Sequence, residues 1–177
     1  MKNLKIILAS IMCFILPGCT SNSIDFYKDK KQKIDMREFF SGEVEGWGAL
    51  FDIGGKQTRS FYVLIKGSWN GNNGILDEVF DFDDGEHTKR KWEVYFENDQ
   101  IFKGRAHDVI GDAKGHQLGN AINLNYILEV PYNNSTIKLS MDDWMYKLDQ
   151  DTILNKTSLK KFGFKVGELV LFMKKKK

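Results

Sequence analysis

The stretch AINLNYILEV, residues 121–130, decides the fold class. Apolar residues occupy every second position in it: Ile122, Leu124, Tyr126, Leu128 and Val130. This period of two is typical of a β-strand with one buried face and one solvent-exposed face. Segments 92–97, 137–141 and 169–174 repeat the same alternation, which indicates a chain built mainly of half-buried strands.

Turn signals separate these segments at short intervals, at 54–55, 71–74, 83–85, 98–99, 133–135 and 149–151. No helix of about ten residues is predicted after residue 46, which argues against parallel βαβ folds because they need crossover helices. We therefore predict an all-β fold of about eight to ten antiparallel strands in a meander. Closure into a lipocalin-like up-and-down barrel would bury one face and remove the strand edges, and a β-sandwich is the alternative.

The amino terminus has the features of a signal peptide, predicted over 1–18. Lys2 and Lys5 precede an apolar run, 6–16, that is too short for a transmembrane helix of about 20 residues. The run ends in Leu16-Pro17-Gly18-Cys19, which resembles the lipobox of bacterial lipoproteins. The resemblance implies cleavage before Cys19, a lipid on its thiol, and a membrane partner held through acyl chains such as palmitate. A secretory signal with an incidental cysteine is the alternative.

Cleavage after residue 18 would remove two lysines and leave 159 of the 177 residues with equal numbers of basic and acidic side chains. Residues 19–34 are predicted to form a polar, flexible tether, and 35–177 a single β-barrel domain that starts with a short helix capped by Asp35. Thr20 is not the Asp retention signal of inner-membrane lipoproteins. Resemblance to Gram-negative lipoproteins therefore implies the cell envelope, at the outer membrane and facing the periplasm.

Composition excludes several classes of protein. The chain has 26 basic and 24 acidic residues, and this near-neutral balance argues against nucleic acid as a partner. Its two cysteines do not form a CxxC pair, which argues against a disulfide framework and a zinc ribbon. His87, His107 and His116 have no metal-binding spacing, so we predict no metal, no cofactor and no assigned catalytic residue.

Several short motifs together resemble a family of uncharacterised bacterial lipoproteins. The most specific are the run Gly104-x-Ala106-x-Asp108-Val109-x-Gly111 and the run 142–146, Asp-Asp-Trp-Met-Tyr. The resemblance covers nearly the whole chain after Cys19. It implies a lipoprotein signal, a lipocalin-like fold and no assigned activity.

Strand alternation places two carboxylates inside the predicted barrel. In a strand expected over 100–110, Asp108 shares a face with Phe102. In the strand that ends near residue 146, Asp143 faces inward while Trp144 and Tyr146 face outward. A buried carboxylate needs a partner or a raised pKa, so both are candidate site residues. The alternative for Asp108 is a strand-end position in contact with solvent or loop amides.

Large rings at inward positions give the main indication of function. A small barrel encloses either a packed core or one small ligand, and apolar walls with a few polar groups suit an acyl chain. We expect a lipid or similar apolar molecule to contact six residues: Trp69, Trp92, Phe102, Asp108, Tyr126 and Asp143. One alternative is a filled barrel that acts as an envelope interaction module through exposed Trp144 and Tyr146. Another is an enzyme on lipid or sugar that uses Asp108 and Asp143.

Overall fold

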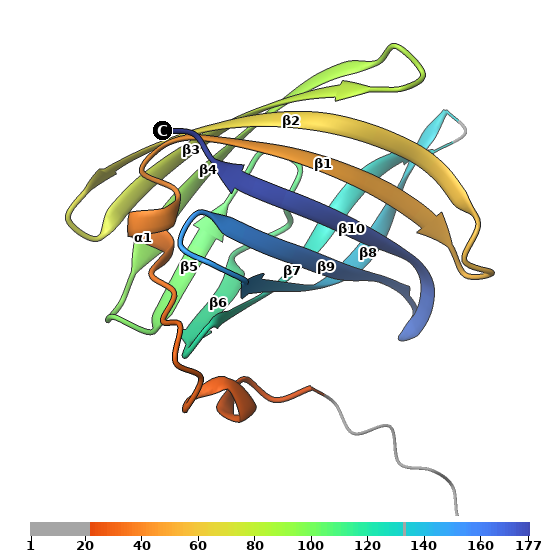
Figure 1. The fold of residues 1–177 in the computed structure, drawn as a ribbon. Coiled ribbons are helices and arrows are strands. Elements are labelled where there is room, and N and C mark those ends of the chain that lie inside the picture. Colours follow the sequence, from red (N-terminus) through yellow and green to blue (C-terminus); the bar gives the residue numbers. More distant parts are fainter. Residues whose placement is uncertain (1–21, 133) are drawn as a thin grey trace, which may run out of the picture.

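The computed structural model describes residues 22–132 and 134–177. The predicted signal peptide and Cys19 lie outside these residues. Each strand pairs with its neighbours in the sequence, and β1 also pairs with β10, which closes the sheet into an antiparallel barrel (Figure 1). The predicted up-and-down barrel is therefore confirmed, and the β-sandwich alternative is wrong.

Ten strands and two one-turn helices make up the described part of the chain. In order they are η1 (Ile24–Tyr27), α1 (Met36–Phe39), β1 (Gly42–Asp52), β2 (Gln57–Asn70), β3 (Asn73–Phe82), β4 (His87–Phe96), β5 (Ile101–Arg105), β6 (Ala113–Leu118), β7 (Ala121–Tyr132), β8 (Ser135–Lys147), β9 (Thr152–Lys161) and β10 (Phe164–Lys175). Across 22–132 and 134–177, no helix is both long and apolar enough to cross a membrane.

The alternation read from the sequence gives the direction of the side chains. In β4, Trp92, Val94 and Phe96 are buried, whereas the residues between them are exposed. In β8, Met141 and Asp143 are buried on the inward face. A period of two thus places one face of every strand toward the barrel interior.

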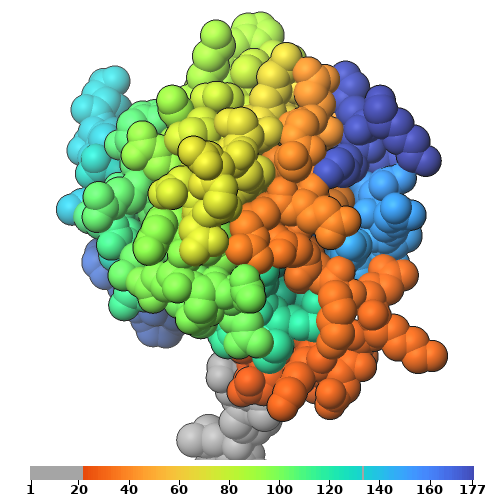
Figure 2. All heavy atoms as spheres, turned by 90° about the vertical axis from the view of Figure 1, so that its left-hand side faces the viewer, coloured from red at the N-terminus to blue at the C-terminus, as the bar shows by residue number. Residues whose placement is uncertain are grey.

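Helix α1 covers one end of the barrel. The Asp35 side chain accepts a hydrogen bond from the Arg37 amide, which confirms the predicted N-cap. Met36 and Phe40 are buried against the barrel, and the Met36 amide donates to Gln117 Oε1 at 2.9 Å. Figure 2 shows this end filled, with the orange N-terminal residues lying among the surrounding turns.

Residues 22–34 pack on the outside of the barrel, although the sequence predicts a flexible tether there. The Tyr27 ring lies 5.8 Å from the Trp144 ring, and Asn22 Nδ2 donates to the Tyr146 hydroxyl at 3.1 Å. Trp144 points outward as predicted but is only 8% exposed, because Tyr27 lies over it. The expectation that Trp144 is exposed is therefore wrong, since the aromatic residues of the polar segment provide a cover.

The strand predicted over 100–110 is shorter than expected. Strand β5 ends at Arg105, and the chain then follows β7, where Val109 makes an isolated bridge to Leu128. The Glu129 amide donates to the Asp108 carbonyl at 2.8 Å. Asp108 therefore belongs to the β5–β6 connection rather than to a regular strand.

Candidate ligand-binding site

The barrel encloses a cavity of about 310 Å³. Met36, the first residue of α1, and Phe40, which follows the helix, form its floor. Inward residues are fully buried near this floor, as at Phe96, and only half-buried toward the opposite end, as at Thr88 and Val130. The cavity therefore opens at the end away from α1, which we call the mouth.

Apolar side chains form most of the cavity wall. Those with the largest rings are Phe61, Phe80, Phe82, Trp92, Phe102 and Tyr126. Trp92 and Tyr126 meet edge to face with their centroids 5.4 Å apart, a favourable arrangement for two aromatic rings. Such walls suit an apolar ligand and leave specificity to the few polar groups among them.

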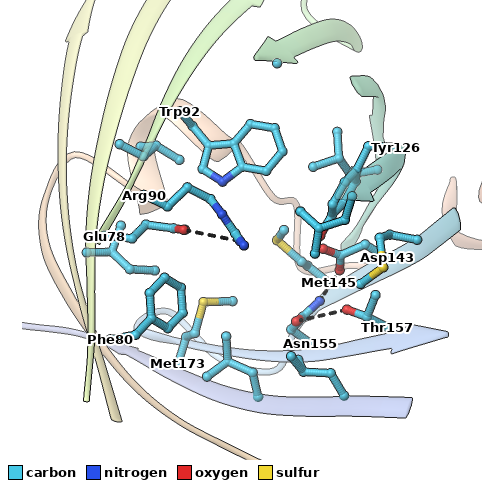
Figure 3. Close-up of a pocket in the computed structure, with 18 of the residues that line it drawn as sticks. Glu78, Phe80, Arg90, Trp92, Tyr126, Asp143, Met145, Asn155, Thr157 and Met173 are labelled. Atoms are coloured by element: carbon cyan, nitrogen blue, oxygen red, sulfur yellow. Dashed lines mark hydrogen bonds and ion pairs between the residues drawn. The ribbon is translucent and has the colours of Figure 1, made fainter. Parts of the chain in front are cut away.

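The first cluster of polar side chains in the wall, Glu78 and Arg90, comes from the β3–β4 hairpin. Glu78 and Arg90 lie directly opposite each other in the register of these strands and both face inward (Figure 3). Arg90 Nε and Nη2 donate to Asp108 Oδ2 at 2.9 and 2.8 Å. Glu78 Oε2 lies 3.8 Å from Arg90 Nη1 and is buried without a hydrogen bond. Arg90 is thus held by Asp108, and Glu78 is left poorly paired.

The second cluster of polar side chains, Asp143, Asn155 and Thr157, lies on β8 and β9. The Asn155 side-chain amide donates to the Asp143 carboxylate and to the Trp144 carbonyl, the latter at 3.0 Å. Thr157 Oγ1 lies 3.5 Å from Asn155 Oδ1. Figure 3 shows these side chains and Tyr126 across the cavity from Glu78 and Arg90. The cavity thus has polar groups on two sides.

Burial changes the proton affinities of these groups. It raises the pKa of Glu78 to about 7, although Arg90 acts in the opposite direction. It also raises the pKa of Asp143 to about 6, against the stabilising hydrogen bond from Asn155. Burial and the Asp143 charge raise the pKa of Tyr126, whose hydroxyl stays neutral. Burial disfavours the charged form of Arg90, but the Glu78 and Asp108 carboxylates outweigh it and raise its pKa. Both cavity carboxyls therefore titrate near neutral pH.

Four of the six predicted ligand contacts line the cavity: Trp92, Phe102, Tyr126 and Asp143. Trp69 packs against Phe96 at 5.9 Å and donates to the Phe40 carbonyl at 3.3 Å, so it belongs to the core near α1. Asp108 touches the site only through Arg90. Ligand contact itself stays a prediction for all six.

Sequence reasoning missed Glu78, Arg90 and Asn155. The strand alternation could have placed two of them inside the barrel, because residues two apart share a face. Glu78 is two residues from inward-facing Phe80, and Arg90 is two residues from inward-facing Trp92. The 83–85 turn fixes the hairpin register that sets the two charges opposite each other.

The mouth is surrounded by apolar side chains at the tips of neighbouring hairpins. Phe162, in the β9–β10 turn, is 89% exposed, and Phe164, the first residue of β10, is 77% exposed. Ile53 in the β1–β2 turn and Tyr132 at the end of β7 are also exposed. Arg59 lies at the rim, bound to Asp84 and Glu86. An apolar ligand would thus meet apolar side chains at the entrance.

No cluster of three or more His, Cys, Asp or Glu residues within 22–132 and 134–177 is arranged to hold a metal ion. Glu78 and Asp143 are carboxyls that can bind a proton or a hydrogen-bond donor. The site can therefore hold an amphiphile by its apolar part and recognise its polar part.

Comparison with known proteins identifies relatives without an assigned activity. The family model described as "Protein of unknown function (DUF3833)" matches residues 13–175. No curated protein matches. Among solved structures, the S-type phycobiliprotein lyase CPES from Guillardia theta superimposes with a TM-score of 0.54 at 10% identity, covering 89% of this chain and 99% of that one. At this identity the likeness shows the fold alone.

Proposed function

The chain belongs to the DUF3833 family, and from that premise we propose that it is a lipid-anchored envelope protein that binds a lipid or similar apolar molecule. One observation carries the proposal: the barrel is hollow, with a cavity of about 310 Å³ whose wall is mostly apolar. A volume of this size is at the lower end for small-molecule sites. A structural barrel would instead fill its interior with side chains.

The fold alone does not separate binding from catalysis. The similar solved structure is named as a lyase, and one barrel can support unrelated functions. The argument for binding rests on this chain's own wall, in which Asn155 binds Asp143, and Arg90 binds Asp108 behind the wall. Both carboxylates are engaged by amide or guanidinium donors, and the proposal is one of binding, without a catalytic step.

Native mass spectrometry of the full chain purified from cells tests the binding proposal. We expect a co-purifying apolar molecule that is lost in Leu128→Trp, because Leu128 lines the cavity and the larger ring fills it. Ile127→Trp is the matched control, since Ile127 is the exposed outward neighbour on β7. Ligand-free native protein, or equal occupancy in both variants, would contradict the proposal.

The anchor is proposed from the lipobox-like run that ends at Cys19. Cys19→Ser should remove palmitate labelling and shift the protein from the membrane to the soluble fraction. Retention of label in Cys19→Ser would sink the anchoring part of the proposal. Such a result would not bear on ligand binding in the barrel, which the mass spectrometry experiment tests separately.

An anchor at Cys19 would also orient the barrel. Only two residues separate Cys19 from Asn22, which is hydrogen-bonded to Tyr146. Three residues of extended chain span at most about 11 Å. The 22–34 segment then lies beside the membrane, together with the Gly119 turn that it bonds to near α1. The mouth, at the opposite end, faces away from the anchoring membrane.

A further inference from the structure

The charges that line the cavity are unequally compensated. Four charged side chains contribute to the wall: Arg59, Glu78, Arg90 and Asp143. Each arginine is already paired with an acid that is not part of the wall. Arg59 is bound by Asp84 and Glu86 at the rim, and Arg90 by Asp108. Arg90 is therefore shared: it is bonded to Asp108, lies 3.8 Å from Glu78 and also acts on Asp143. Three acids around one guanidinium leave an excess of negative charge when all three are ionised.

Arg90 is near Glu78 but donates no hydrogen bond to it, and the amide donor at Asp143 is neutral. Glu78 Oε2 is buried, makes no hydrogen bond and is 3.8 Å from the nearest Arg90 nitrogen. The guanidinium donates instead to Asp108. Asp143 accepts a hydrogen bond from the neutral amide of Asn155. A buried carboxylate without a cation is costly, and either a proton or a cationic partner relieves that cost.

Resting on the proposed function, we propose that the cavity selects amphiphiles with a primary amine at the polar end, whose ammonium group donates to Glu78 and Asp143. The apolar chain of such a ligand would lie along the walls formed by residues such as Phe61 and Leu128. An ammonium has three N–H donors, so it can make a charge-assisted hydrogen bond to a carboxyl and still donate to neighbouring acceptors. A ligand carboxylate would instead add a fourth acid to the three that already interact with Arg90.

Protonation of the cavity sets the pH dependence of this selectivity. Glu78 is faced by Arg90 and Trp92 from β4, Asp108 from the β5–β6 connection, Tyr126 from β7 and Asp143 from β8. Of these, Asp143 also has a raised pKa, and Tyr126 and Arg90 keep their charge states near neutral pH. Acid therefore neutralises the two carboxyls that would hold the ammonium. Amine binding should weaken as the pH falls from 8 to 5.

The test compares octylamine, octanol and octanoate, which share one chain length. Each displaces Nile red from the purified full chain in a non-ionic amphipol, and Leu128→Trp measures the background uptake. At pH 8 we expect octylamine to bind about tenfold more tightly than the other two, as charge-assisted hydrogen bonds allow. The octylamine advantage should fall by about tenfold at pH 5, whereas octanol binding changes little.

A double variant tests whether Glu78 and Asp143 cause the preference for the amine. Glu78→Gln combined with Asp143→Asn should bring the three affinities to within about threefold. Asp77→Asn is the matched control, because Asp77 is the exposed neighbour of Glu78 on β3. Circular dichroism checks the fold, and the ligand series on the unsubstituted chain tests the proposal even where the double variant unfolds.

The outcomes distinguish the two proposals. Equal or tighter binding of octanol or octanoate overturns the amine preference and leaves the apolar site intact. A preference that persists in the folded double variant also overturns it. Binding of none of the three chains contradicts the proposed function itself, and the amine preference with it.

Discussion

Replacement of Glu78 by glutamine should stabilise the protein in a pH-dependent way. Burial raises the Glu78 pKa from its ordinary value of 4.5 to about 7. The folded chain therefore holds the Glu78 proton more tightly than the unfolded chain does. Glutamine resembles the protonated acid in size and polarity but cannot ionise.

The direction in which the stability difference changes with pH follows from linkage between protonation and folding. Below the unfolded pKa near 4.5, Glu78 is protonated in both states, and its stabilising contribution is fully present. That contribution is lost as the pH rises through about 7, where the folded carboxyl ionises in its buried site. At about 1.4 kcal/mol per pKa unit, the raised pKa corresponds to roughly 3 kcal/mol as an upper bound. Glu78→Gln should regain most of this at pH 8.5 and almost none at pH 4.5.

Urea unfolding followed by tryptophan fluorescence at pH 4.5, 6.5 and 8.5 measures the difference. The gap in free energy of unfolding between variant and parent should widen with each step toward high pH. Asp77→Asn should show no such widening, since Asp77 is exposed on the outer face. A gap that stays constant across the three pH values, or that narrows with rising pH, would refute the reasoning.

Three substitutions test the packing around the site. Gly115→Ala should cost about 1–3 kcal/mol in urea unfolding, because its Cβ would lie 2.2 Å from the buried Phe102 ring. Tyr27→Ala should uncover Trp144, with increased acrylamide quenching and a loss of about 1 kcal/mol; unchanged quenching would contradict the packing described. Asp35→Ala removes the N-cap of α1 and should cost about 1 kcal/mol, and no change in unfolding midpoint would speak against that cap.

The fold was predictable because one physical rule acts on every strand. Alternation in 121–130 sets inward and outward faces, and the turn residues set where each strand ends. The rule failed where the chain leaves regular geometry. Asp108 comes after β5 has ended, and Val109 pairs with β7 instead. A connection that bonds to a strand distant in sequence leaves no periodic signal.

The site was only partly predictable, for a different reason. The alternation of the strands predicts that Trp92, Tyr126 and Asp143 face inward. It does not predict the empty space between them, because alternation gives the direction of a side chain and not the volume that the side chains leave unfilled. Glu78 and Arg90 obey the same alternation, but charged side chains are usually exposed to solvent, so alternation alone does not predict that these two are buried. Only the pairing of neighbouring strands shows that two opposite charges can be buried together.

The energetic cost of the cavity's polar groups favours a role in binding over a role in stability. Ionised Glu78 destabilises the fold by up to roughly 3 kcal/mol at high pH, and its Oε2 makes no hydrogen bond. An apolar side chain at residue 78 would fill space and avoid this cost, since buried ionic groups are seldom the most stable choice. Local departures from the most stable arrangement are typical of functional sites. The buried Glu78 carboxyl and the empty space of the cavity are two such departures, and they lie at the same place. A bound amphiphile with a donor group would fill the space and provide Glu78 with a hydrogen bond.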